Sequence, residues 1–273
     1  MHIETISYPR LKDSVCKCLN IDQSVLLKEM TELSRIEQEH GEGEFNEKVV
    51  EFIGSCDLQI PDEIEFYHLG WRLDNEESGE SKNLRELMLS KNSFSDYLKA
   101  HNITFLNGDC LKIFYKGNEI LASEQSSDRV ANYLRMRLGI DDDDRCVNGF
   151  AFRDSLEKVS YWNHLRRGPE FLQQFSEYIE ERNLIDDYIK NSHYFCFEYM
   201  VPISDIIIDG HDEIDNKEKT YYLLGQCFRH LLKYHRNRLY PDFRDEDDNV
   251  FLRLEDDATM KKEWFVSKEL IVV

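Results

Sequence analysis

Residues 194–209 read YFCFEYMVPISDIIID and form the strongest strand candidate in the chain. It is rich in aromatic and β-branched residues, which suit the pleated, half-buried surface of a β-strand. Because side chains alternate along a strand, we expect one face to carry Phe195, Phe197 and Tyr199 and the other face to carry Glu198. A charged residue is rare in such a strand and costly to bury unpaired, so Glu198 has either a function or a solvent-facing position.

Other short apolar runs upstream have the same β-strand character. We predict strands in IEFYHLGW (64–71), ITF (103–105), LKIFYKGNEI (111–120) and CVNGFAF (146–152). Within 111–120, the sequence Lys116-Gly117-Asn118 is typical of a turn and predicts a hairpin.

Between and beyond these strands, apolar residues recur at helical spacing. The region 10–55 is predicted to be helical with a loop at GEGEF (41–45), and Gly139 suits the C-terminal end of a helix. Asp154 and Ser155 are candidate N-terminal caps. The remaining predicted helices cover 83–100, 131–140, 153–165, 169–190 and 219–237.

Runs of strands and helices in this order predict an α+β fold. We divide the chain into a helical N-terminal extension (1–60), a β-rich core (61–210) and a helical C-terminal extension packed on the core (211–273). With 273 residues, 41% of them hydrophobic, the chain has enough apolar surface for a sizeable core.

The composition restricts the partners. A formal net charge of −20 disfavours a broad nucleic-acid groove, because such a field repels phosphate backbones. No segment reaches the roughly 18 apolar residues that a membrane span needs, and the N-terminus lacks an apolar stretch of secretory length. We therefore expect a cytoplasmic protein without membrane contact.

The cysteines and acidic runs do not predict a metal site. Seven scattered cysteines are typical of reduced thiols, and Cys16 and Cys18 have no second pair at zinc-ligand spacing. The runs DDDD (141–144) and DEDD (245–248) lack the ligand pattern of an EF-hand and are interpreted as solvated loops.

Three segments stand out as candidates for chemistry. The first is FYHLG (66–70), with a histidine inside an apolar strand. The second is GFAFRD (149–154), followed by Tyr161 in the next predicted helix. The third is FCFEYMVP (195–202), which contains Glu198. Each segment alone is more often explained by packing in the core. Their order along the chain supports a functional interpretation of the three segments together.

This order resembles the ADP-ribosyltransferase superfamily, in its diphtheria-toxin and poly(ADP-ribose)-polymerase branch with a His-Tyr-Glu triad. FYHLG is similar to the aromatic-His-Gly strand of that branch, with one residue inserted before Gly70. Phe150 and Tyr161 have the family's eleven-residue spacing between two aromatics, and Glu198-Tyr199 is similar to its late Glu-Tyr strand. The resemblance covers residues 64–209 and implies a split, mixed or antiparallel ADP-ribosyltransferase-like sheet.

The resemblance also implies roles in cleaving NAD. Glu198 would stabilise the oxocarbenium ion at the ribose and orient the acceptor. His68 would bind a ribose hydroxyl, and Gly70 and Gly149 would lie close to the cofactor. Phe150 and Tyr161 would enclose the nicotinamide ring. The pyrophosphate would meet one of two arginines, Arg72 or Arg153.

The predicted function is therefore a mono-ADP-ribosyltransferase with NAD as its substrate. The acceptor is a protein or a nucleic acid, and a role as a toxin or antiviral effector would imply a neutralising protein partner. NAD hydrolysis, with water as acceptor, is a close alternative. An RNA 2′-phosphotransferase shares the fold but lacks the late glutamate, and it ranks lower.

A second hypothesis is a non-catalytic, partner-binding protein that retains the fold. The position of the triad tyrosine holds Phe150 or Ala151, so its hydroxyl is missing, and Leu69 follows His68 where the family has glycine. The helical segments 1–60 and 211–240 would then serve as docking surfaces.

Overall fold

The computed structural model describes residues 1–73, 80–108, 111–121, 128–140, 146–154, 156–239 and 249–272, without the side chains of 235–239. The chain forms two compact units that interleave along the sequence. Unit 1 comprises Met1–Tyr67, Phe150–Val159 and Met200–Leu252, and unit 2 comprises His68–Gly149, Ser160–Tyr199 and Arg253–Val273. Helices and antiparallel strands both contribute, and the predicted α+β class is confirmed.

The main sheet has the strand order β10-β7-β2-β6-β9-β8, with the short β1 parallel to β2. β10 runs antiparallel to β7 and places Ser267 opposite Glu198. The strands are β1 (His2–Ile3), β2 (Glu63–Leu73), β6 (Asn148–Phe150), β7 (Ser192–Pro202), β8 (Ile207–Ile208), β9 (Phe251–Arg253) and β10 (Phe265–Ile271).

The strand predicted over 64–71 is confirmed, whereas the stretch 194–209 is not one strand. β7 ends at Pro202, a 3-10 turn covers Ile203–Asp205, and β8 follows. Proline has no backbone N–H to donate to a neighbouring strand, which explains why the ladder stops there.

A small second sheet lies in unit 2 and has the order β3-β4-β5. It consists of β3 (Ile103–Leu106), β4 (Lys112–Tyr115) and β5 (Asn118–Ile120). The predicted hairpin turn is confirmed: Lys116 and Gly117 both have positive φ, at 50° and 82°. Positive φ at two successive residues gives the turn a backbone twist that matches the right-handed twist of the flanking strands.

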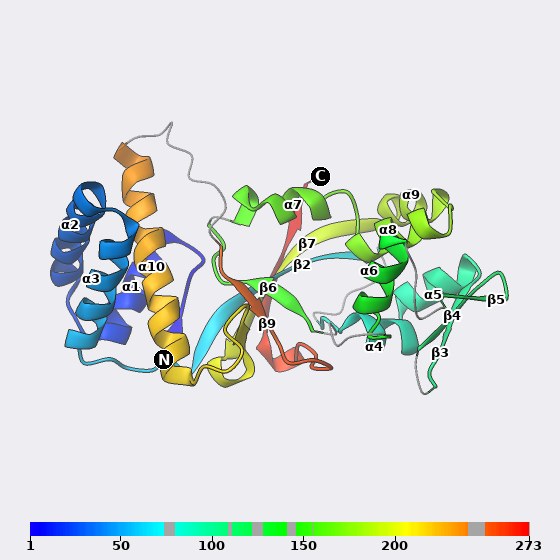
Figure 1. Cartoon of the computed structure of the whole chain (residues 1–273), viewed down its shortest axis with the longest axis horizontal. Helices are drawn as coiled ribbons and strands as arrows, with labels where there is room; N and C mark the ends of the chain where they lie inside the picture. Colours follow the sequence, from blue (N-terminus) through cyan, green and yellow to red (C-terminus); the bar gives the residue numbers. More distant parts are fainter. Residues whose placement is uncertain are drawn as a thin grey trace. The chain divides into compact units, whose positions relative to one another are not determined.

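The helices of unit 1 pack against one another, as Figure 1 shows for α2, α3 and α10. The predicted loop at 41–45 is wrong, because only Gly41, with φ of 86°, separates α2 from α3. The acidic residues Glu42 and Glu44 fall in the first turn of α3, where the helix dipole favours negative charge. The helices are α1 (Tyr8–Leu19), α2 (Gln23–His40), α3 (Glu42–Ser55) and α10 (Asn216–Leu239).

Unit 2 contains shorter helices than predicted. The helix expected over 83–100 is two helices, and so is the helix expected over 169–190. The residue Glu180, with φ of 55°, lies in the second break. The helices are α4 (Leu84–Leu89), α5 (Ser93–Ala100), α6 (Arg129–Arg137), α7 (Ser160–Leu165), α8 (Glu170–Tyr178) and α9 (Asn183–Lys190).

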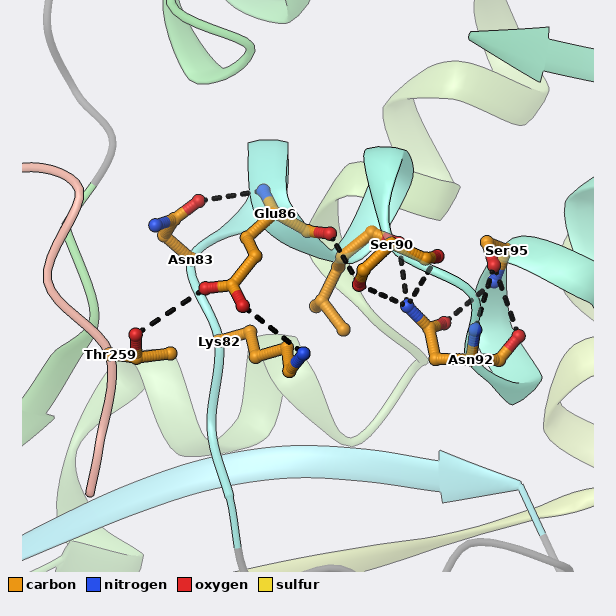
Figure 2. A network of polar contacts seen from close by, with 8 residues as sticks. Lys82, Asn83, Glu86, Ser90, Asn92, Ser95 and Thr259 are labelled. Atoms are coloured by element: carbon orange, nitrogen blue, oxygen red, sulfur yellow. Dashed lines mark hydrogen bonds and ion pairs between the residues drawn. The ribbon is translucent and has the colours of Figure 1, made fainter. Parts of the chain in front are cut away.

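The break between α4 and α5 has a visible cause in Asn92 (Figure 2). Its side-chain oxygen accepts a hydrogen bond from the backbone N–H of Ser95 at 2.8 Å. In return, the Ser95 hydroxyl accepts a hydrogen bond from the backbone N–H of Asn92 at 3.1 Å. The Asn92 amide also donates to the carbonyl of Leu87, at 2.8 Å. This capping box starts a new helix and ends the previous one at the same point.

The remaining predicted boundaries shift modestly. α6 starts at Arg129, where the Asp128 side chain accepts from the backbone N–H of Val130, and Gly139 follows it with a positive φ, as expected. The helix predicted over 153–165 is a 3-10 turn (Leu156–Lys158) followed by α7. The predicted cap Ser155 and the acidic runs 141–144 and 245–248 lie outside the described residues.

Candidate active site

The three segments that carry the candidate residues form neighbouring strands. Glu198 lies in β7, His68 in β2 and Gly149 in β6, and the hydrogen-bonded order is β7-β2-β6. These segments are far apart in the sequence, so only the sheet brings them side by side.

His68 joins β2 to β6. Its Nδ1 donates to the backbone carbonyl of Asn148 at 2.8 Å, which leaves the lone pair on Nε2. Burial, together with the positive charge of Arg72, lowers the pKa of His68 to about 4. The ring is therefore neutral at physiological pH, and its centroid lies 6.2 Å from that of Phe197.

Arg72 lies on the same face of the sheet. Its guanidinium carbon is 4.4 Å from the centre of the Phe197 ring. The guanidinium donates to the carbonyl of Trp71 at 3.0 Å and to the hydroxyl of Ser81 at 2.8 Å, and Ser81 in turn bonds the hydroxyl of Tyr199 at 2.8 Å. Arg72 forms no ion pair within the described part of the chain.

Gly70 allows these two side chains to approach one another. A Cβ at this position would lie 2.8 Å from Nη1 of Arg72 and 3.3 Å from Nε2 of His68. A side chain here would therefore displace the guanidinium. The tight packing explains why a glycine stands in the middle of a long strand.

Glu198 projects from the opposite face. The rings of Phe195, Phe197 and Tyr199 follow one another at 5.8 and 6.4 Å, as expected for one face of β7. Glu198 alternates with them, and its carboxylate accepts from the hydroxyl of Ser267 at 2.6 Å. Because His68 contacts Phe197, the structure does not bring His68 and Glu198 to one side of the sheet.

Tyr161 belongs to the helix that covers the Glu198 face. The indole of Trp71 stacks on Tyr194 at 5.4 Å and donates to the carbonyl of Leu165 in α7 at 2.7 Å. Trp162 meets Tyr194 edge-on at 5.9 Å. The half-buried Tyr161 donates its hydroxyl to Glu170 at 2.6 Å, which fixes its ring at the start of α7.

Two of the predicted residues lie in unit 1, namely Phe150 and Arg153. Phe150 is 3% exposed, and its ring packs against Phe251 at 4.9 Å. Arg153 pairs with Glu157 at 3.6 Å. Gly149 is buried and directly precedes Phe150 in β6.

Sequence reasoning missed Tyr194 and Ser267. Tyr194 is 1% exposed, and its hydroxyl has no hydrogen-bond partner among the residues that the structure describes. Burial, with smaller contributions from Cys196 and Tyr161, raises its pKa. The alternation of side chains along β7 places Tyr194 on the face of Glu198, so the sequence pattern could have identified Tyr194. No sequence pattern could have identified Ser267, because its position opposite Glu198 depends on the pairing of β10 with β7.

Comparisons with protein-family models, with curated proteins and with solved structures give no match. None of the described helices combines the length and apolarity needed to cross a membrane. Within the described ranges, no group of three His, Cys, Asp or Glu residues is arranged to hold a metal ion. The six described cysteines are free thiols, and burial raises the pKa of Cys18 to about 11.

Proposed function

We propose that this protein cleaves the nicotinamide–ribose bond of NAD and transfers ADP-ribose to a macromolecular acceptor. The observation that supports this proposal is the adjacency of β7, β2 and β6, which carry the three segments similar to the transferase motifs. If the three segments resembled the transferase motifs only by chance, they would not be expected to form neighbouring strands of one sheet.

In this proposal Glu198 is the catalytic carboxylate. The bond between the ribose C1′ and the nicotinamide nitrogen breaks, and nicotinamide leaves with the electron pair. The carboxylate stabilises the positive charge on the ribose. The acceptor then bonds to C1′, and its proton passes to the carboxylate or to solvent. Ser267 orients Glu198 through their hydrogen bond.

The other candidate residues have different roles according to the face of the sheet on which they lie. Tyr161 lies on the helix of the Glu198 face and is the aromatic residue assigned to nicotinamide. His68 and Arg72 lie on the opposite face, so we assign them to holding β2, β6 and β7 together rather than to NAD. The proposal extends to a cytoplasmic toxin or antiviral effector with a neutralising partner.

A second candidate function is a non-catalytic protein that binds a partner. The separation of His68 and Glu198 onto opposite faces favours it, because a triad must surround one ligand. NAD hydrolysis uses the same step as the transferase, with water as the acceptor.

The test is nicotinamide release from NAD by the wild type and two variants, with and without cell lysate. Glu198→Gln is expected to lower the rate about 100-fold or more. Glu269→Gln is the matched control, because Glu269 pairs with Cys196 and projects from the same face of the sheet. It should retain wild-type activity.

Lysate dependence would indicate a macromolecular acceptor, and release without lysate would indicate hydrolysis. Equal rates for Glu198→Gln and the wild type would rule out Glu198 as the catalytic group. If the wild type neither releases nicotinamide nor binds NAD, the partner-binding function is favoured.

A further inference from the structure

A pocket of about 320 Å³ lies in unit 1, and neither Glu198 nor Tyr161 is among its lining residues. Its size is at the lower end of the range found for small-molecule sites. One wall is a face of α10, and the others are the end of β8 and the start of β9. The residues that matter are Asp209, Tyr222, Gln226, Arg229, Asn249 and Phe251.

Hydrogen bonds hold the walls in place. The backbone N–H of Asp209 donates to the carbonyl of Phe251 at 3.1 Å. The side-chain amide of Asn249 both accepts from and donates to the backbone of Phe152, at 3.0 and 2.6 Å. A site with fixed walls loses little entropy when it binds a ligand.

Several polar groups that line the pocket are unpaired within the part of the chain that the structure describes. The Tyr222 hydroxyl, the Gln226 amide and the Asp209 carboxylate form no hydrogen bond or ion pair with the residues that the structure describes. Tyr222 and Gln226 are nonetheless half-buried. Polar groups that converge in a concave site without internal partners are typical of ligand recognition.

An aromatic surface lies beside these groups. Phe251 is 42% exposed, although it is a large apolar residue, and Phe150 packs against its ring at 4.9 Å. The buried neighbour holds the ring in position. Such a ring offers a planar ligand a surface for stacking.

The charges of the pocket restrict the ligand further. Arg229 is paired with Glu42, and it also donates to Asn46 at 2.7 Å. Its positive charge is therefore already compensated, whereas Asp209 is not paired within the described ranges. In a chain with a net charge of −20, this arrangement disfavours a phosphate and favours a ligand that donates hydrogen bonds.

We propose that this pocket binds an uncharged nucleoside whose base carries an exocyclic amino group. The base stacks on Phe251, and its amino group donates to the carboxylate of Asp209. Gln226 and Tyr222 bond the remaining polar atoms of the base and the sugar. This site is independent of the proposed NAD chemistry.

The experiment is a calorimetric titration of the full chain with adenosine, guanosine, cytidine and uridine, and with AMP. Because binding is measured without turnover, its outcome does not depend on nicotinamide release. We expect saturable binding of at least one amino-bearing nucleoside. Uridine should bind more weakly, and AMP more weakly than adenosine if adenosine binds.

Phe251→Ala is expected to weaken binding about 5- to 100-fold. This fold-change in Kd corresponds to the free energy that stacking of one base on an aromatic ring contributes. Asp209→Asn should reduce the preference for amino-bearing bases. Tyr234→Ala is the matched control, because Tyr234 is an exposed aromatic residue of α10 that does not line the pocket. Thermal unfolding of each variant verifies that the protein is folded.

Absence of binding for all four nucleosides at millimolar concentration would overturn the proposal. So would wild-type affinity in a folded Phe251→Ala variant, or a preference for uridine. Tighter binding of AMP than of adenosine would overturn the argument from charge and with it the proposed ligand class.

Discussion

Two tyrosines in the same sheet have opposite hydrogen-bonding situations. Tyr67 is 1% exposed, and its hydroxyl donates to the carboxyl group of Glu65 at 2.5 Å. Glu65 is itself 3% exposed and also accepts from the backbone N–H and the hydroxyl of Thr5. Tyr194 is equally buried, but its hydroxyl has no partner in the described part of the chain.

This contrast predicts different effects for the same chemical change. Tyr67→Phe removes a hydrogen bond from a buried carboxyl group and should reduce the free energy of unfolding by about 1–3 kcal/mol. Tyr194→Phe removes a hydroxyl that forms no hydrogen bond with the described residues, and it should be neutral or slightly stabilising. Urea unfolding monitored by circular dichroism measures both. Equal losses would contradict the assignment of the Glu65 contact as the stabilising one.

Among the elements of unit 2, α4 and α5 both begin at a side-chain cap. α4 starts where the side chain of Asn83 accepts from the backbone N–H of Glu86, and α5 starts at the capping box of Asn92 (Figure 2). Glu86 also pairs with Lys82 at 3.1 Å. A short helix contains few backbone hydrogen bonds beyond its first turn, so each cap contributes a larger share of its stability than in a long helix.

Asn92→Ala is therefore expected to lower the free energy of unfolding by about 1 kcal/mol. It removes the acceptor for Ser95 and the donor to Leu87. Lys91→Ala is the control, because Lys91 is exposed and precedes the cap, and it should change stability by less than about 0.5 kcal/mol. A loss of equal size in both variants would show that the capping box contributes nothing specific.

At the scale of the whole molecule, two histidines predict how stability depends on pH. Burial lowers the pKa of His68 to about 4 and, with Lys233 and Lys158 nearby, the pKa of His230 to about 3. His230 stacks on Phe152 at 3.7 Å. The unfolded chain binds these protons below about pH 6.5, whereas the folded chain binds them only below about pH 4 at His68 and about pH 3 at His230.

These two groups should therefore destabilise the fold as the pH falls from about 6.5 toward 4. Each contributes on the order of 1–2 kcal/mol between about pH 6.5 and 5. His230→Phe keeps a ring against Phe152 without a titrating group, so its unfolding free energy should fall less between pH 7 and pH 5. His211→Gln, at an exposed histidine, is the control. An unchanged pH dependence in His230→Phe would contradict the prediction.

Features that depend only on neighbouring residues could be predicted from the amino-acid sequence. The strand character of 64–71, the turn at Lys116-Gly117 and the end of a helix at Gly139 all agree with the structure. Alternation along 194–202 also placed Phe195, Phe197 and Tyr199 on one face. The breaks within 83–100 and 169–190 were missed, because apolar spacing continues across a short junction.

How these elements face one another follows from packing between segments that are far apart in the sequence. Whether His68 and Glu198 share a side depends on the register between β2 and β7, and a shift of one residue reverses every side chain. The pocket of unit 1 is another case, since its residues come from α10, β8 and β9. Sequence patterns describe periodicity within a segment, whereas register and convergence are set by packing between segments.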